Sequence, residues 1–275
     1  MEFIELSVEC PVEMSEILMA EFSDIGYDTM IEIDGGFKAY ITDNQFERTT
    51  ILEVIERYAS SNISWSTSTI QRENWNSEWE KNYDPIVVEG RCIVKAVFHD
   101  IKERYPYEIT INPKMSFGTG HHETTYQILD LQTSIDHSNK TVMDAGCGTG
   151  VLAIMAELRG AKKVEAFDID DWCIDNSNEN FGLNNCKNCT VKQGTINELH
   201  FEDPFDIIIA NINKNVLIND MGKFASHLKK DGELILSGFY QNDLEDIKQC
   251  ADSNNLAYTK HTSRNNWVAA CFQKK

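Results

Sequence analysis

The segment VMDAGCGTGVL, residues 142–152, constrains the fold of this chain more than any other feature. An apolar run leads into three alternating glycines, Gly146, Gly148 and Gly150, and then into residues with helical spacing. Glycines let the backbone turn tightly and approach a ligand, with amides and a helix N-terminus aimed at it. Asp168 ends the next apolar run, where a carboxylate accepts both hydroxyls of a ribose. We therefore expect a nucleoside site in an open α/β sheet.

The spacing of the glycines disfavours two common nucleotide sites. A dinucleotide fingerprint has the form G-x-G-x-x-G, but its third glycine would fall at Val151 or Ala153. No Walker lysine follows the glycines, and Asp144 would repel a pyrophosphate while tolerating a cationic ligand. The pattern D-x-G-x-G-x-G resembles motif I of the class I S-adenosylmethionine-dependent methyltransferases.

Length and composition set the broad class of the protein. A chain of 275 residues with 41% hydrophobic residues holds two domains or one large one. Its apolar runs fall short of the ~20 residues of a membrane helix, and its acidic start, residues 1–5, does not look like a secretory signal. We expect a cytoplasmic protein without a membrane partner. The net charge of −19 repels nucleic acid and attracts basic partners, or merely maintains solubility.

The eight cysteines lack the spacing of a disulfide framework. Cys186 and Cys189 form a lone C-x-x-C in an Asn-rich turn. A zinc site needs about four ligands, and neither a second cysteine pair nor a histidine pair lies nearby in the sequence. We therefore predict reduced thiols in a loop and no metal.

The first 70 residues read as a small α+β domain of their own. The expected order is βαββαβ, from Ile4–Cys10, Val12–Phe22, Tyr27–Ile33, Phe37–Ile41, Phe46–Tyr58 and Ile63–Ile70. This order suggests a ferredoxin-like domain. Because it has no cluster of catalytic residues, it is interpreted as a substrate-recognition module or as a purely structural one.

Residues 71–84 are predicted to form a linker helix, in which Trp75, Trp79 and Tyr83 share one face. Residues 85–275 form the second predicted domain, which starts with two strand-like runs, Val87–Phe98 and Glu108–Asn112. Strands are then expected at Thr141–Asp144, Lys163–Phe167, Cys189–Lys192, Phe205–Ala210, Glu233–Ser237, Tyr258–His261 and Val268–Phe272, and helices at Val151–Leu158, Trp172–Phe181, Val216–Leu228 and Asp243–Ser253. This alternation predicts a mainly parallel, doubly wound sheet with a hairpin at one edge.

Three polar residues, Asp144, Asp168 and Asn211, fall at the ends of predicted strands. Ligands of such sheets bind beyond the carboxyl ends of the strands, so these residues should share one crevice. Asp168 is favoured as the ribose ligand over Asp170, which is expected to cap the next helix. The Asn211 amide could accept an N–H bond from an amine, or it could only form a turn. The chain lacks the Asn-Pro-Pro-aromatic motif of base-flipping enzymes, which disfavours a nucleic-acid substrate.

The segment 112–125 (NPKMSFGTGHHETT) is the second distinctive feature. Gly118 and Gly120 allow a mobile or tightly folded loop, and Thr124 or Thr125 could cap a helix or bind the cofactor. The two histidines and Glu123 lack H-E-x-x-H spacing, which disfavours a metal.

Five motifs in order resemble the PrmA family, which methylates the large-subunit ribosomal protein numbered eleven. They are FGTGHHETT at 117–125, DAGCGTG at 144–150, FDID at 167–170, ANI at 210–212 and LILSG at 234–238, followed by Gln241. The Trp-rich linker (NWNSEW, 74–79) is also similar, so the resemblance covers the chain from about residue 73 onward. Two departures are Asn213-Lys214, where the family commonly has an apolar pair, and Gly194-Thr195, which lacks an acid near the adenine.

The resemblance implies a class I methyltransferase sheet that uses S-adenosylmethionine and releases S-adenosylhomocysteine. It implies repeated methylation of lysine side chains and an N-terminal α-amine of the ribosomal protein. From the chemistry of its amide, we predict Asn211 as the catalytic residue that orients the amine. The cofactor positions that carry over are Thr125, Gly146, Asp168 and Asn211, to which we add Asp144, Gly148, Phe117 and Thr119. We expect a monomer without a direct nucleic-acid partner. The alternatives are a small-molecule amine methyltransferase and a non-catalytic cofactor-binding module.

Overall fold

The structure is a computed structural model that describes residues 3–59, 61–70, 83–114 and 116–275. The chain divides into two compact units, Met1–Asn82 and Tyr83–Lys275. The predicted linker helix at 71–84, with Trp75 and Trp79, lies almost entirely outside the described residues. The domain boundaries after residues 70 and 84 stay predictions.

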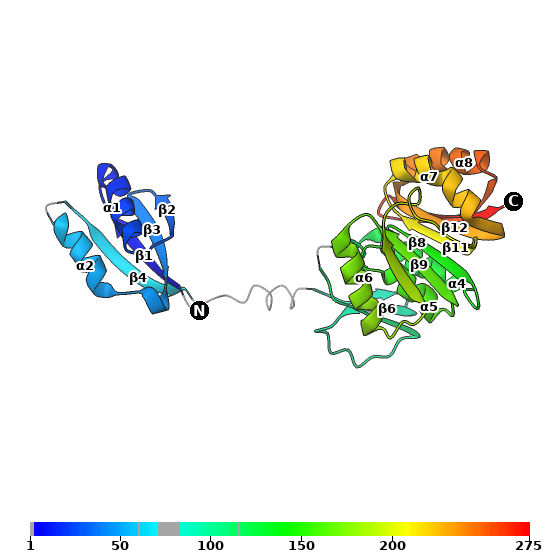
Figure 1. The fold of residues 1–275 in the computed structure, drawn as a ribbon, viewed down its shortest axis with the longest axis horizontal. Helices are drawn as coiled ribbons and strands as arrows, with labels where there is room; N and C mark the ends of the chain where they lie inside the picture. Colours follow the sequence, from blue (N-terminus) through cyan, green and yellow to red (C-terminus); the bar gives the residue numbers. More distant parts are fainter. Residues whose placement is uncertain (1–2, 60, 71–82, 115) are drawn as a thin grey trace. The chain divides into compact units, whose positions relative to one another are not determined.

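The first unit is a four-stranded antiparallel sheet covered by two helices (Figure 1). Its elements are β1 (Phe3–Glu9), α1 (Val12–Asp24), β2 (Thr29–Ile33), β3 (Gly36–Thr42), the short helix η1 (Asp43–Gln45), α2 (Arg48–Arg57) and β4 (Ser64–Ile70). The strand order β2-β3-β1-β4 agrees with the expected βαββαβ topology. Alternate residues of β1, namely Ile4, Leu6 and Val8, are buried in a core of this unit's own residues.

The second unit is built on a seven-stranded sheet in the order β10-β9-β8-β11-β12-β14-β13. Its strands are β8 (Thr141–Ala145), β9 (Lys163–Asp168), β10 (Cys189–Gln193), β11 (Phe205–Asn211), β12 (Leu228–Tyr240), β13 (Leu256–Arg264) and β14 (Trp267–Lys274). Strands β10, β9, β8, β11 and β12 run parallel, and β14 pairs antiparallel with both β12 and β13. The predicted doubly wound, mainly parallel sheet with a hairpin at one edge is confirmed.

Helices cover both faces of this sheet (Figure 1). They are α4 (Glu123–Ser134), α5 (Val151–Leu158), α6 (Asp171–Leu183), α7 (Lys214–His227), the short η2 (Gln241–Asp243) and α8 (Leu244–Ser253). Residues of α4, α5 and α6 share one apolar core, and residues of α7 and α8 share the other. Two separate cores are what a sheet buried on both faces requires. In the described part of the chain, no helix has the length and apolar character needed to cross a membrane.

A three-stranded sheet, β5-β6-β7, accompanies the large one. It consists of β5 (Ile86–Val88), β6 (Cys92–Ala96) and β7 (Tyr107–Ile111). The single strand-like run expected at Val87–Phe98 is wrong, because the chain reverses at Glu89 and Gly90, whose φ values are +47° and +65°. These two residues form a tight turn that is closed by a hydrogen bond from the Arg91 nitrogen to the Val88 carbonyl at 2.9 Å, and the sequence Glu-Gly is a weak signal for such a turn.

Candidate active site

A cavity of about 560 Å³ opens at the carboxyl ends of the parallel strands. The residues that follow β8, β9, β10 and β11 form most of its wall, as expected for an open α/β sheet. Five of the predicted site residues line this cavity: Phe117, Gly146, Gly148, Asp168 and Asn211. Thr119, Thr125 and Asp144 are described residues that lie outside its lining.

The glycine turn after β8 needs its glycines for conformation and for space. Gly148 has a φ of +56°, and a Cβ there would lie only 2.1 Å from the carbonyl oxygen of Phe117. The backbone nitrogen of Thr149 donates to that same oxygen at 2.9 Å, and Thr149 Oγ1 donates to the Gly118 carbonyl at 2.7 Å. The loop that contains Phe117 is therefore bonded directly to the glycine turn, and the Phe117 ring, 51% exposed, faces the cavity.

Asp168 ends β9 and is bonded to both neighbouring turns. Its Oδ2 accepts from the Gly148 nitrogen at 2.9 Å, and its Oδ1 accepts from the Asp170 nitrogen at 3.2 Å. Each carboxylate oxygen accepts more than one hydrogen bond, so lone pairs remain for hydroxyls of a ligand. Asp170 occupies the N-cap position of α6, as predicted, but its side chain makes no cap hydrogen bond.

Asp144 lies behind the glycine turn and is completely buried. Its Oδ2 accepts from the backbone nitrogen of Ala153 at 3.0 Å in the first turn of α5, while its Oδ1 has no hydrogen-bond partner among the described residues. Burial and, to a smaller extent, the negative charge of Asp168 raise the pKa of Asp144 to about 7, although the hydrogen bond from the Ala153 nitrogen lowers it. The hydrogen bond that the Asp144 side chain makes is with the start of α5. A role of Asp144 in cofactor binding stays a prediction.

Asn211 ends β11 at the wall of the cavity. Its Nδ2 donates to Thr125 Oγ1 across a long 3.4 Å contact, which joins α4 to the end of the strand. Its Oδ1 is buried and has no hydrogen-bond partner among the described residues. A buried carbonyl oxygen without a partner is costly in a folded protein, and here the missing partner is most simply an N–H group of a ligand.

A row of four aromatic side chains leads from the cavity to the end of β12 and the start of β14. This row was not predicted from the sequence. It consists of Phe117, His122, Trp267 and Tyr240, with centroid distances of 5.1, 4.6 and 4.0 Å between successive rings. Tyr240 and Trp267 meet because they are directly paired in the antiparallel register of β12 and β14. The sequence offered no signal for this pairing, because the register depends on an irregularity in β12.

His122 links the aromatic row to the start of α4. Its Nδ1 accepts from the backbone nitrogen of Thr124 at 3.3 Å, so this histidine is the N-cap of the helix that carries Thr125. Burial lowers the pKa of His122 below its usual value, and the ring is therefore neutral at physiological pH. Thr119, by contrast, contacts His121 at 3.4 Å from Oγ1 to Nδ1, away from the cavity lining.

The apolar side of the cavity was also missed. Ile169 and Trp172, which are 64% and 54% exposed, follow Asp168 in the cavity lining, and Ile196, on the loop after β10, also lines it. Exposed apolar side chains beside a ribose-type carboxylate suit a flat heterocyclic base. The sequence feature that could have indicated this apolar wall is Ile169, the apolar residue directly after Asp168.

The cavity rim also gathers possible metal ligands. Oxygen atoms of Asp168 and Asp170 and the Cys173 sulfur lie within 4.8 Å of one another. Asp168 is already bonded to two backbone nitrogens at the ligand wall, and burial raises the pKa of the Cys173 thiol. This group therefore belongs to the nucleoside site.

Known proteins resemble this chain over its whole length. Residues 11–275 match the PrmA family, described as ribosomal protein L11 methyltransferase. The chain is 39% identical over 281 residues to a Phocaeicola vulgatus protein of that name, with 100% of both covered. It is 41% identical over 260 residues to a Porphyromonas gingivalis protein of the same name, covering 94% of this chain and 90% of the relative. A solved structure of ribosomal protein L11 methylase from Lactobacillus delbrueckii subsp. bulgaricus aligns with a TM-score of 0.64 at 27% identity, covering 70% of this chain and all of that one.

Proposed function

This chain belongs to the PrmA family of ribosomal protein L11 methyltransferases, and we propose that it methylates lysine side-chain and N-terminal α-amines of ribosomal protein L11. It is an S-adenosylmethionine-dependent methyltransferase with a class I fold. The choice of amines rests on one observation above all, the buried and unpartnered Oδ1 of Asn211 at the wall of the cavity.

The residues of the cavity fit S-adenosylmethionine. Its volume of about 560 Å³ is within the usual range of small-molecule sites. Asp168 would hold the ribose hydroxyls, the glycine turn at Gly146 and Gly148 would lie against the cofactor, and Ile169 would lie against its base. Two carboxyl groups in the cavity lining, those of Asp168 and Asp170, favour a cationic ligand over a phosphate. When bound, S-adenosylmethionine supplies a methyl group on a sulfonium centre.

The contribution of the protein is to hold and desolvate the amine. Asn211 Oδ1 would accept an N–H bond from the amine and so orient its lone pair. A lysine has a pKa near ~10.4, and only its neutral form is nucleophilic. The aromatic row (Phe117, His122, Trp267, Tyr240) offers an apolar approach that would lower that pKa by desolvation. Alignment of two reactants in a water-poor site is a large part of the rate enhancement of such reactions.

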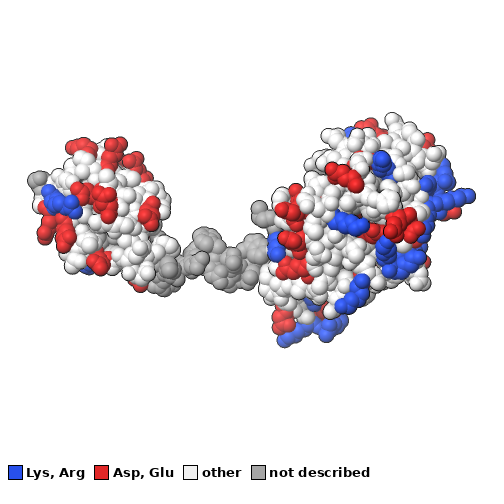
Figure 2. All heavy atoms as spheres, viewed as in Figure 1, with Lys and Arg blue, Asp and Glu red and all other residues white. Residues whose placement is uncertain are grey.

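The first unit is proposed to bind the protein substrate. Residues 1–70 contain 14 acidic and three basic residues. Figure 2 shows acidic side chains spread over the visible face of this unit. Opposite charge steers a basic partner toward such a surface and disfavours nucleic acid. We also propose that the chain acts as a monomer in the cytoplasm, without a direct nucleic-acid partner.

Radiolabelled S-adenosylmethionine tests this function directly. The purified chain is incubated with L11 from cells that lack the enzyme, and the modified residues are identified by mass spectrometry. We expect label on lysine and N-terminal amines of L11, and loss of transfer by at least 100-fold in Asn211→Ala at a cofactor concentration that saturates the variant.

Two outcomes would contradict the proposal. Label on a small amine, with L11 left unmodified, would support the small-molecule alternative. Tight cofactor binding without transfer to any acceptor, in wild type and Asn211→Ala alike, would support a non-catalytic module.

A further inference from the structure

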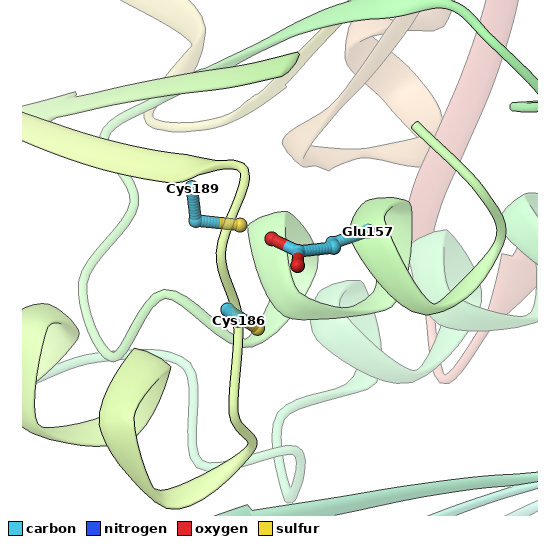
Figure 3. Close-up of side chains that lie close together, drawn as sticks. All are labelled: Glu157, Cys186 and Cys189. Carbon is cyan, nitrogen blue, oxygen red and sulfur yellow. The ribbon is translucent and has the colours of Figure 1, made fainter. Parts of the chain in front are cut away.

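Two cysteines and a glutamate lie close together near the C-terminal end of α5, the helix that follows the glycine turn. Glu157 lies in the last turn of α5, Cys186 follows α6, and Cys189 begins β10 (Figure 3). A carboxylate oxygen of Glu157 and the two sulfur atoms all lie within 4.8 Å of one another. These three residues do not line the cofactor cavity. The sequence showed only the lone cysteine pair, because the third residue is about thirty positions away and is brought in by the packing of α5 against β10.

The carboxylate of Glu157 organises the turn between the cysteines. Its Oε1 accepts from the backbone nitrogen of Lys187 at 2.7 Å, and its Oε2 accepts from that of Asn188 at 2.9 Å. Both residues between the cysteines are thus held by one carboxylate, and the turn is set with its thiols on either side. Each carboxylate oxygen keeps a further lone pair. In Figure 3 the Cys189 sulfur points toward this carboxylate.

The three side chains offer ligand atoms for a metal ion, but no cationic side chain among the described residues neutralises the Glu157 carboxylate. In the part of the chain that the structure describes, no lysine or arginine forms an ion pair with Glu157. A bound cation would displace protons from the two thiols, because thiolates are the form of cysteine that ligates a metal. All three side chains are partly exposed, so an ion has access.

We propose that Glu157, Cys186 and Cys189 bind one divalent cation of the zinc type, with water as the fourth ligand. Two thiolates and one carboxylate select a borderline-soft ion such as Zn²⁺ over Mg²⁺ or Ca²⁺, which take oxygen ligands. Bond lengths of about 2.0–2.3 Å place neighbouring ligand atoms of a tetrahedral zinc site about 3.3–3.8 Å apart. The three ligand atoms now lie within 4.8 Å of one another, so side-chain rotations would have to bring them closer together to reach that spacing. The bound ion would link the C-terminal end of α5 to β10, the edge strand of the large sheet.

Cobalt titration of the reduced, metal-free full chain tests this site, because thiolate bonds to Co²⁺ give a charge-transfer absorption. We expect one equivalent of Co²⁺ to bind, Zn²⁺ to displace it, and Zn²⁺ to raise the melting temperature. Cys186→Ser and Cys189→Ser should abolish the absorption, and Glu157→Gln should weaken Zn²⁺ affinity at least tenfold. Cys250→Ser is the matched control, since Cys250 is a partly buried cysteine elsewhere and its loss should leave the stoichiometry at one.

Several results would overturn the proposal. They are the absence of a charge-transfer band in the wild type, a band that survives in the Cys186→Ser/Cys189→Ser double variant, and an unchanged affinity in Glu157→Gln. Formation of a Cys186–Cys189 disulfide without metal binding by the reduced chain would also overturn it. Circular dichroism confirms that each variant is folded. Because the cluster lies apart from the cofactor cavity, cofactor affinity measured on the same samples reports on the proposed function separately.

Discussion

The backbone nitrogen of Gly148 lies 2.9 Å from Oδ2 of Asp168, so the glycine turn after β8 and the carboxylate at the end of β9 are joined by a hydrogen bond. The two parts of the nucleoside motif are therefore one structure before any ligand arrives. A site that is already ordered loses less conformational entropy when it binds. Changes at either residue should act first on cofactor affinity.

Asp168→Asn should weaken S-adenosylmethionine binding about 10- to 100-fold. Hydrogen bonds to a charged acceptor are worth about 1.5–3 kcal/mol, and a neutral amide offers the ribose hydroxyls only one oxygen. Asp170→Asn is the control, because Asp170 also lines the cavity and carries the same charge, and it should change affinity less than threefold. Calorimetric titration measures both dissociation constants, and equal losses in the two variants would contradict the assignment of Asp168.

Gly148→Ala should lower cofactor affinity at least tenfold and also destabilise the fold. Its Cβ would lie 2.1 Å from the Phe117 carbonyl oxygen, and the φ of +56° is unfavourable for any side chain. The loop that carries Phe117 would have to move away. Gly182→Ala is the matched control, since Gly182 lies inside α6 with nothing within 4 Å of its Cβ position. That change should raise stability by up to about 1 kcal/mol. Denaturant unfolding measures both effects, and a Gly148→Ala variant with wild-type affinity would refute the steric argument.

Much of the site followed from the sequence where a local pattern decides the structure. The helix after the glycine turn was predicted at Val151–Leu158 and occurs there, because alternating glycines followed by apolar residues at helical spacing leave few alternatives. Asp168 and Asn211 were placed at the cavity by the general rule for parallel sheets.

The rest depended on pairing between distant residues. The contact of Tyr240 with Trp267 requires the register of β12 and β14, and the approach of Glu157 to the cysteines requires the packing of α5 beside β10. Neither leaves a trace in local spacing. Asp144 shows a different limit of sequence analysis. The motif identified the residue, but only the structure shows that its side chain is completely buried behind the turn and hydrogen-bonded to α5.

Trp267→Ala should raise the KM for L11 about tenfold and leave cofactor affinity unchanged. The ring lies between His122, which it meets edge to face, and Tyr240, against which it is tilted, outside the lining of the cofactor cavity. Removal of one aromatic contact that lies against a substrate costs on the order of 1–2 kcal/mol. Tyr258→Ala provides a control on an exposed ring of the neighbouring strand β13. Initial rates over a range of L11 concentrations separate KM from kcat, and an effect on kcat alone would argue against a role in substrate binding.

Asp144 should make the cofactor-free protein less stable as the pH rises from about 4 to about 7. Its pKa is raised from 3.8 to about 7 in the folded state, so in this window the folded protein holds a proton that the unfolded chain has lost. The free energy of unfolding then falls with pH by up to about 1.4 kcal/mol per unit, and the effect levels off above pH 7. Asp144→Asn keeps an acceptor for the Ala153 nitrogen but does not titrate. The difference in unfolding free energy between Asn variant and wild type should therefore grow across the window. A difference that is constant with pH would contradict the raised pKa.

Removal of residues 1–82 should abolish efficient methylation of L11 and leave cofactor binding intact. Among the described residues, those that line the cavity and those that form the two apolar cores of the second unit all belong to that unit, so residues 83–275 should fold without the first. If the acidic first unit captures L11 by charge, the KM of the full chain should also rise several-fold between about 0.05 and 0.5 M salt. Over that range the Debye length shortens about threefold, which weakens the attraction between the two proteins. The truncated chain should show a high KM that is nearly independent of salt. Initial rates at each ionic strength, with calorimetry of cofactor binding as the control, measure both effects. A truncated chain that methylates L11 with the wild-type KM would show that recognition resides in the second unit instead.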